Sequence, residues 1–380
     1  MSEGEIIYLD HAAATPLIPE AATAMTDAYR DAPGNPSSIG RPGRAAARLV
    51  RQARERLARV VGVHPERLLF TSGGTESIGL AVLGTMQGRD GGHVITSAIE
   101  HPAVLGSVRM LEQRGFEVTR VSPERGGVVD PAKFAAAARP DTVLACLMHV
   151  NNELGTVQPL AAALGGVKER APRCQTLVDA VQSFTRLELE SDGWQADLVA
   201  LSGHKIGGPR GVGALVTGRR RPGPLFGGGD QEWGVRPGTE NLPGIVGFAV
   251  AADHGERTRP SRMSHASDLA DAFLAALAER VPRAQVNGSA EARVPWIVSV
   301  SVAGLPSEAL LRGMEEHGVC VSAGAACHAR SQKQSHVLQA VGLSPRLGTM
   351  RVSFGAPNTP DHARRAAEAL ALTVERYALP

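Results

Sequence analysis

Short apolar runs alternate with longer stretches of mixed polarity along most of this chain, a pattern typical of strands followed by helices. Short apolar runs occupy residues 68–71, 93–97, 116–121, 142–148, 176–178, 198–201 and 213–216, and stretches of mixed polarity separate most of them. Strands that alternate with helices predict a mainly parallel sheet covered by helices on both faces. We therefore expect an α/β fold whose catalytic residues gather at the ends of the strands.

The pattern changes after residue 251, where the polar stretch 253–267 precedes a second region. A helix is predicted over 267–280, and strands are predicted near 296–302 and 319–322. A chain of 380 residues is long enough for about two domains. We expect a large domain over residues 13–257 and a smaller domain formed by residues 1–12 and 258–380.

Seven arginines between residues 41 and 59 form a series that also occurs in nucleic-acid-binding helices. They are Arg41, Arg44, Arg48, Arg51, Arg54, Arg56 and Arg59. Because apolar residues such as Leu49, Val50 and Leu57 lie between them, an amphipathic helix with a solvated face is the better interpretation. The formal net charge of +2 agrees with a protein that does not bind nucleic acid directly.

The composition favours a cytoplasmic protein. Hydrophobic residues make up 43% of the chain, yet no apolar run approaches the roughly 20 residues that cross a bilayer. The first five residues are acidic and lack the basic and apolar regions of a secretory signal peptide. The four cysteines are far apart, so neither a disulfide framework nor a structural zinc site is expected, and we predict no bound metal.

A lysine at the end of an apolar run is the first sign of catalytic chemistry. Lysines are usually solvated surface charges, but an amine partly removed from water, as expected for Lys205, loses its proton more easily and can form a Schiff base. The run 176–178 ends in Asp179, which could pair with a protonated pyridine nitrogen. Gln182 could donate to a ring hydroxyl oxygen, and Ser202 and His204 flank the lysine where a phosphate could bind. These residues together predict a site for pyridoxal 5'-phosphate.

A possible phosphate cradle follows the first strand of the predicted sheet. Residues 72–77 read Ser-Gly-Gly-Thr-Glu-Ser, so Gly74 and Thr75 would lie at the start of a helix. Backbone N–H groups at such a point favour an anion. The loop alone is weak evidence because glycine-rich turns are common in α/β proteins. It matches neither of the common nucleotide-binding motifs, which makes a nucleotide less plausible than a phosphorylated cofactor.

Ordered matches to one family extend over nearly the whole chain. They lie at 8–16, 34–38, 70–76, 100–101, 149–155, 179–182, 202–205, 236–241, 322–328 and 350–355. In these segments the chain resembles the cysteine desulfurases, a class V branch of the fold-type I pyridoxal-phosphate enzymes that includes selenocysteine lyases. The resemblance implies an α/β fold-type I transferase with a mainly parallel seven-stranded sheet, a smaller α+β C-terminal domain and a homodimer.

The resemblance also implies a role for each matching residue. Lys205 would carry the cofactor and move protons at the substrate Cα, and His101 would stack on the ring and act as a catalytic residue. Arg351 would bind the substrate carboxylate with its planar guanidinium group, with Asn35 close by. Cys327 would take the sulfur of L-cysteine as a persulfide while alanine is released. Cofactor contacts are implied for Gly74, Thr75, Asn152, Asp179, Gln182, Ser202, His204, Lys205 and, from the other protomer, Thr239.

The setting of Cys327 favours reactivity, because a thiolate is stabilised by cationic neighbours and the polar stretch after it contains Arg330 and Lys333. Most isolated cysteines are small buried hydrophobes, which is our interpretation of the other three, Cys146, Cys174 and Cys320. Residues 324–328 read Gly-Ala-Ala-Cys-His, a sequence closer to selenocysteine lyases than to the commoner desulfurases. The segment 327–342 is as long as in NifS-like and IscS-like desulfurases, which implies transfer of sulfur to an acceptor protein.

Three classes of function remain open at this point. A pyridoxal-phosphate-dependent cysteine desulfurase, with L-selenocysteine as an alternative substrate, is favoured. Another class V reaction such as transamination would leave Cys327 without a role, and a partner-binding protein without chemistry would not need Lys205. The final acceptor also stays open among iron–sulfur cluster assembly, tRNA thiolation, DNA phosphorothioation and selenium recycling. Docking of an acidic acceptor protein at Arg48 and Arg51 is a further hypothesis.

Overall fold

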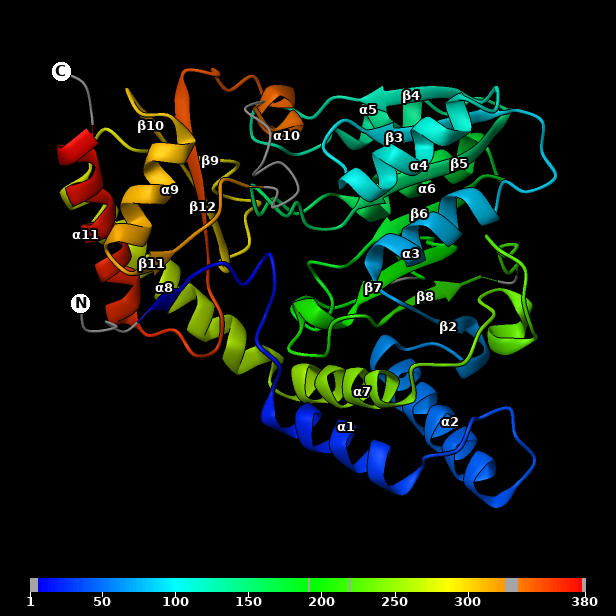
Figure 1. Ribbon diagram of the computed structural model, residues 1–380. Helices are drawn as coiled ribbons and strands as arrows, with labels where there is room; N and C mark the ends of the chain where they lie inside the picture. The colour runs from blue at the N-terminus through cyan, green and yellow to red at the C-terminus, as the bar shows by residue number, and fades with distance from the viewer. Residues whose placement is uncertain (1–5, 191, 219, 325–333, 378–380) are drawn as a thin grey trace.

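The computed structural model describes residues 6–190, 192–218, 220–324 and 334–377, and a seven-stranded sheet is its central feature. The strands are β2 (Leu68–Thr71), β3 (His93–Ser97), β4 (Glu117–Val121), β5 (Thr142–Met148), β6 (Gln175–Asp179), β7 (Leu198–Ser202) and β8 (Gly213–Thr217). They lie in the order β2-β8-β7-β6-β5-β3-β4 (Figure 1). Within this sheet β8 is antiparallel to β2 and β7, and the other neighbouring pairs are parallel. The predicted mainly parallel α/β sheet is therefore confirmed.

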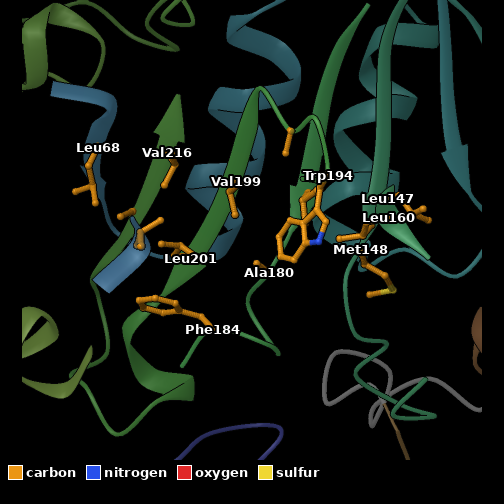
Figure 2. Close-up of a cluster of buried hydrophobic side chains, with 14 of the residues drawn as sticks. Leu68, Leu147, Met148, Leu160, Ala180, Phe184, Trp194, Val199, Leu201 and Val216 are labelled. Carbon is orange, nitrogen blue, oxygen red and sulfur yellow. The ribbon is translucent and has the colours of Figure 1, made fainter. Parts of the chain in front are cut away.

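Helices cover both faces of this sheet, as expected for parallel strands. They are α1 (Pro19–Asp31), α2 (Arg41–Val61), α3 (Gly74–Gly79), α4 (Pro102–Glu112), α5 (Pro131–Ala136), α6 (Leu160–Arg170) and α7 (Leu242–Arg257). Successive residues of a strand point to opposite faces, so Leu147 of β5 packs with Leu160 of α6 while Cys146 packs with Val104 of α4 on the other side. Figure 2 shows Leu68, Val199, Leu201 and Val216 in the first of these two layers.

The arginine-rich segment forms helix α2, which confirms the amphipathic interpretation. Ala46, Val50, Ala53 and Leu57 on one side of the helix are buried against the sheet layer. The helix ends at Gly62, whose φ of 77° lies in the left-handed region that glycine adopts without strain.

A second group of strands and helices forms a smaller α+β unit. Its antiparallel strands are β9 (Gln285–Asn287), β10 (Ile297–Ala303) and β12 (Leu347–Ser353), and a parallel pair is formed by β1 (Ile7–Tyr8) and β11 (Val319–Cys320). Its helices are α8 (Arg259–Arg280), α9 (Ser307–Glu316), α10 (His336–Ala340) and α11 (Pro360–Tyr377). Leu269, Phe273, Val300 and Leu370 belong to the separate core of this unit. The boundary between residues 257 and 258 stays a prediction.

Three expectations for the C-terminal half are wrong in detail. The polar stretch 253–267 is helical rather than a linker, since α7 continues to Arg257 and α8 begins at Arg259. Pro260, in the first turn of α8, was the sequence signal for that start. Strand β11 ends at Cys320, two residues earlier than predicted, and this cysteine is partly exposed although Cys146 and Cys174 are buried.

No helix in the described ranges is long and apolar enough to cross a membrane.

Candidate active site

The carboxyl ends of the parallel strands open into a cavity of about 270 Å³. Its wall includes ten of the predicted site residues: Gly74, Thr75, His101, Asn152, Asp179, Gln182, Ser202, His204, Lys205 and Arg351. Asp179 ends β6 and Ser202 ends β7, so both lie at the same edge of the sheet, where Asp179 is in register with Ala200, two residues before Ser202. The site thus lies where α/β sheets bind their ligands.

Lys205 lies in the short turn that follows β7, and its amine is removed from water. The Nζ atom donates to the carbonyl oxygens of Ala12 at 2.6 Å and Ala13 at 2.7 Å. Burial, assisted by the positive charge of Arg351, lowers the pKa of Lys205 to about 8. A sizeable fraction of the amine is therefore neutral near pH 8 and able to act as a nucleophile or a base.

Asp179 and His101 form a buried pair of titratable groups on the cavity wall. An oxygen of Asp179 accepts from the backbone N–H of Val181 at 3.0 Å, and His101 accepts through Nδ1 from the N–H of Ala103 at the start of α4. Burial raises the pKa of Asp179 and lowers the pKa of His101, while each group opposes the shift of the other. A buried carboxyl group of this kind is stabilised in its charged form by a cationic partner.

Another part of the cavity wall, at Gly74, Ser202 and His204, allows a ligand to approach the backbone closely. A Cβ atom on Gly74 would lie 2.8 Å from Cγ2 of Val181, so a side chain at this position would need Val181 to move. The hydroxyl of Ser202 and Nδ1 of His204 are 2.9 Å apart. Burial lowers the pKa of His204 to about 4, so the ring is a neutral hydrogen-bonding group at physiological pH.

The set of groups around the cavity fits pyridoxal 5'-phosphate. Gln182 donates through Nε2 to the carbonyl oxygen of Ala12 at 2.9 Å, and its Oε1 is buried without a partner among the described residues. The sequence predicted that Gln182 donates to a ring hydroxyl oxygen, whereas the amide in this orientation offers an acceptor instead. A carboxyl group, an amide, a hydroxyl and an amine are the groups that such a cofactor requires. The described residues contain no cluster of three or more His, Cys, Asp or Glu arranged for a metal ion.

Arg351 projects from β12 into the same cavity and is 2% exposed. Its Nη2 donates to Oδ1 of Asp10 at 2.6 Å, and its Nη1 donates to the carbonyl oxygen of Asn152 at 2.7 Å. Its Nε is buried and has no partner among the described residues. The role of Asp10 was missed from the sequence, although it lies within the first segment of the family resemblance. Arg351 therefore has Asp10 as an internal carboxylate partner.

Two predicted residues do not line this cavity. Asn35 and Thr239 are exposed and face each other, with Nδ2 and Oγ1 3.4 Å apart. Thr239 was predicted to reach the cofactor of the other protomer, so its absence from the cavity of its own chain agrees with that prediction without testing it. Asn35 was predicted to lie near Arg351, and within one chain it does not. The hydrogen bond between them holds the two side chains together at the surface.

Cys327 lies outside the described residues, but the chain on both sides of segment 325–333 is joined to the site. Ser322 is bonded through its backbone to Arg351, and Gly324 packs against the buried Glu153. On the other side, Nε2 of His336 lies 2.8 Å from the carbonyl oxygen of Glu100, the residue before His101. The segment that contains Cys327 therefore leaves and re-enters the described structure beside the cavity.

Buried histidines make the stability of the fold sensitive to acid. Burial lowers the pKa of His11, His149 and His204 to about 4 each, while burial raises the pKa of Glu100 to about 8. Between pH 4.5 and 6.5 the unfolded chain binds more protons at the histidines and fewer at Glu100, a net excess of about two protons. We predict that the free energy of unfolding falls by on the order of 1–3 kcal/mol per pH unit as the pH drops through this range. Urea titrations at several pH values measure it.

A variant and its control separate this effect from general acid denaturation. His149 packs edge-on against Trp194, with ring centroids 4.5 Å apart, so His149→Phe keeps an aromatic contact and removes one titrating group. The slope of the unfolding free energy against pH should decrease by the amount that corresponds to about one bound proton. His64→Phe is the control, because the side chain of His64 is 70% exposed and stays in water whether or not the chain is folded. Equal slopes for His149→Phe and the parent protein would contradict the prediction.

Comparisons with known proteins agree on one family. Residues 7–365 match the family model described as aminotransferase class-V. Cysteine desulfurase IscS of Dictyoglomus turgidum is 36% identical over 97% of this chain and 95% of its own length. Cysteine desulfurase IscS of Anaeromyxobacter dehalogenans is 39% identical over 92% of this chain and 87% of its own length.

Solved structures agree with these relatives. A NifS-like protein superposes with a TM-score of 0.90 and 31% identity, covering 98% of this chain and 100% of its own. A structure described as SspA in complex with cysteine superposes with a TM-score of 0.81 and 34% identity, covering 91% of this chain and 98% of its own. DndA from Streptomyces lividans gives a TM-score of 0.76 and 37% identity, covering 91% of this chain and 99% of its own.

Proposed function

The chain belongs to the aminotransferase class-V family, and from this premise we propose that it is a pyridoxal-phosphate-dependent cysteine desulfurase. It converts L-cysteine to L-alanine and passes the sulfur to Cys327. One observation carries the proposal: Lys205, Asp179, His101 and Arg351 line a single cavity, beside which the segment containing Cys327 leaves and re-enters the fold.

The cofactor would be held in this cavity. Lys205 would bind its aldehyde carbon, Asp179 would pair with its ring nitrogen, and Gln182 would contact its ring hydroxyl. The backbone of Gly74 and Thr75, with the Ser202 hydroxyl, would bind the phosphate. When bound, the cofactor supplies an electron sink for the pair that is released at the substrate Cα.

Arg351 binds the substrate, and Lys205 transfers the proton. Arg351 exchanges its bond with Asp10 for the substrate carboxylate and so orients the Cα–H bond toward Lys205. The neutral amine of Lys205 then takes the Cα proton, as its lowered pKa permits near neutral pH. His101, whose pKa burial holds below its usual value, would contact the ring as a neutral imidazole.

Sulfur transfer completes the reaction with balanced bonds. The Cys327 thiolate attacks the sulfur of the bound cysteine, so an S–S bond forms and the substrate Cβ–S bond breaks. The electron pair of the broken bond stays on the substrate carbon, which takes a proton and leaves as alanine. The enzyme keeps a persulfide, and its outer sulfur is passed to a thiol of an acceptor protein.

Product formation from two substrates tests this assignment. Wild type and Cys327→Ala are compared for alanine and sulfide from L-cysteine in the presence of a thiol reductant, and for alanine and selenide from L-selenocysteine. The variant should lose sulfur release down to the background rate, because no thiolate remains to attack the substrate sulfur. Cys320→Ala is the matched control, since burial raises the pKa of the Cys320 thiol and keeps it protonated.

Each result separates the candidate functions. Retained selenide release by Cys327→Ala would mean that selenium leaves without the thiol, which favours selenocysteine lyase activity. Alanine formed only when a keto acid is consumed would replace the proposal by transamination. If the wild type forms no alanine from either substrate, the desulfurase assignment is wrong.

The destination of the sulfur depends on the protein that docks at Cys327. The relatives and solved structures carry the different names IscS, SspA and DndA, and none of these names assigns an acceptor to this chain. We place the reaction in the cytoplasm of the cell, in a homodimer in which Thr239 of each chain reaches toward the cofactor of the other. The acceptor would be a protein that brings a thiol to Cys327.

A further inference from the structure

A second and larger cavity, of about 400 Å³, lies behind the turn that carries Lys205. It is enclosed by the connection between β1 and α1, by α8, and by the loop after β12, elements that run close together where α8 leaves the end of α7 (Figure 1). Apolar side chains form most of its wall, among them Leu17, Ile18, Met263, Trp296 and Phe354. It shares no lining residue with the active-site cavity.

The charged groups of this wall are unbalanced. Arg186 and Arg262 both line the cavity, and neither has a carboxylate within ion-pair distance among the described residues. Arg259 is paired with Glu256 at 2.9 Å, and Glu20, the one carboxylate of the wall, is more than half exposed and next to His254. Two guanidinium charges in a largely apolar wall are costly unless an anion balances them.

Hydrogen-bond donors in the same wall are also left over. Nη1 of Arg186, Nε of Arg262 and Nε1 of Trp296 are buried and have no partner among the described residues. Arg186 is 9% exposed and Trp296 is 2% exposed, and the guanidinium carbon of Arg186 lies 5.3 Å from the centre of the Trp296 ring. As the side chains stand, these nitrogens are screened from solvent, so water in the cavity does not satisfy them, and water would also leave the charge excess in place. An anionic acceptor satisfies both requirements at once.

We propose that this cavity binds a small carboxylate with an apolar body. The two arginines and the indole N–H hold the carboxylate, and the apolar wall takes the rest of the molecule. The donor nitrogens are screened from water, so binding requires these side chains to turn toward the cavity. Guanidinium groups match a carboxylate in two parallel bonds, and the apolar wall disfavours a fully hydrated anion such as inorganic phosphate.

The site is joined to the catalytic lysine through one carbonyl group. Nη2 of Arg186 and Oγ1 of Thr15, both residues of the cavity wall, donate to the backbone oxygen of Lys205 at 3.1 Å each. A ligand that turns Arg186 therefore acts on the turn that positions Lys205.

Calorimetric titration of the full-length holoenzyme with 3-phenylpropanoate tests the proposal. The carboxylate should bind saturably at one site per chain, while 3-phenylpropanamide and inorganic phosphate should each bind at least about tenfold more weakly, as expected on losing a charge-assisted bond or the apolar contact. Arg262→Gln should weaken carboxylate binding by about tenfold or more. Arg257→Gln is the matched control, because Arg257 lies outside the cavity with its side chain 69% exposed.

A second variant guards against a folding defect in Arg262→Gln, whose guanidinium also donates to the carbonyl oxygens of Thr185 and Gly255. Ala356→Trp adds bulk at an exposed position of the cavity wall and should weaken binding of the carboxylate without touching the buried arginines. Three results would overturn the proposal: no saturable binding at millimolar 3-phenylpropanoate, equal binding of the amide or of phosphate, or no greater weakening in both variants than in Arg257→Gln.

Discussion

Replacement of Lys205 by alanine is expected to lower the rate of alanine formation from L-cysteine by about 10²–10⁴-fold, the range for loss of a positioned acid–base group. Burial lowers the pKa of this amine to about 8, and no other described residue of the cavity wall has such a value. Lys205→Arg should be equally inactive, because a guanidinium group keeps its proton at any physiological pH. Single-turnover measurements of alanine with cofactor supplied in excess give the rates.

Two controls make this result specific. Lys133→Ala removes a lysine that is 62% exposed and paired with Glu124, and should leave the rate unchanged. Small primary amines added to Lys205→Ala should restore part of the rate, and the restored rate should rise with pH as the amine becomes neutral. A variant that keeps more than a tenth of the wild-type rate without added amine would remove Lys205 from the reaction.

Most strands of this sheet could be predicted from sequence because they are short apolar runs buried on both faces, whereas β4 at the sheet edge is partly exposed. The runs at 68–71, 93–97 and 142–148 coincide with β2, β3 and β5, and the other predicted strands of the large sheet differ from the observed ones by one residue at one or both ends. Helix α8 was predicted eight residues late, because Arg259 and Arg262 suggest a linker in sequence although they face a cavity in the fold. Polar residues on a helix become informative only when their surroundings are known.

The candidate site could likewise be predicted only where it depends on local sequence patterns. The end of a strand predicts where Asp179 and Lys205 lie, because the neighbours in a parallel sheet follow from regular structure. The bond between Arg351 and Asp10 joins residues 341 positions apart in sequence. It depends on the pairing of β1 with β11 and on the bridge between Ser322, just after β11, and Arg351 in β12. No local pattern encodes such a contact. The second cavity was also invisible, since its wall comes from several separate segments of the chain.

Arg351→Gln is expected to raise the KM for L-cysteine by about 10- to 100-fold, which corresponds to the loss of one charged hydrogen-bonded contact. The guanidinium group is the one in the cavity wall with a buried Nε that lacks a partner among the described residues. L-cysteine methyl ester removes the other partner of this contact, because it lacks the free carboxylate of the substrate. The kcat/KM of wild type should be much higher for the acid than for the ester, and that of Arg351→Gln should be similar for both.

The double comparison separates substrate binding from structural damage. Removing Arg351 leaves Asp10 without its ion-pair partner in a partly buried position, which can destabilise the fold and lower both reactions together. A structural defect therefore lowers kcat/KM for acid and ester by the same factor, whereas loss of carboxylate binding lowers it for the acid alone. Arg346→Gln, at an exposed position just before β12, is the matched control and should leave both values unchanged. If Arg351→Gln still prefers the acid as strongly as wild type does, the carboxylate is held by another residue, and Asn35 of the second protomer is the next to test.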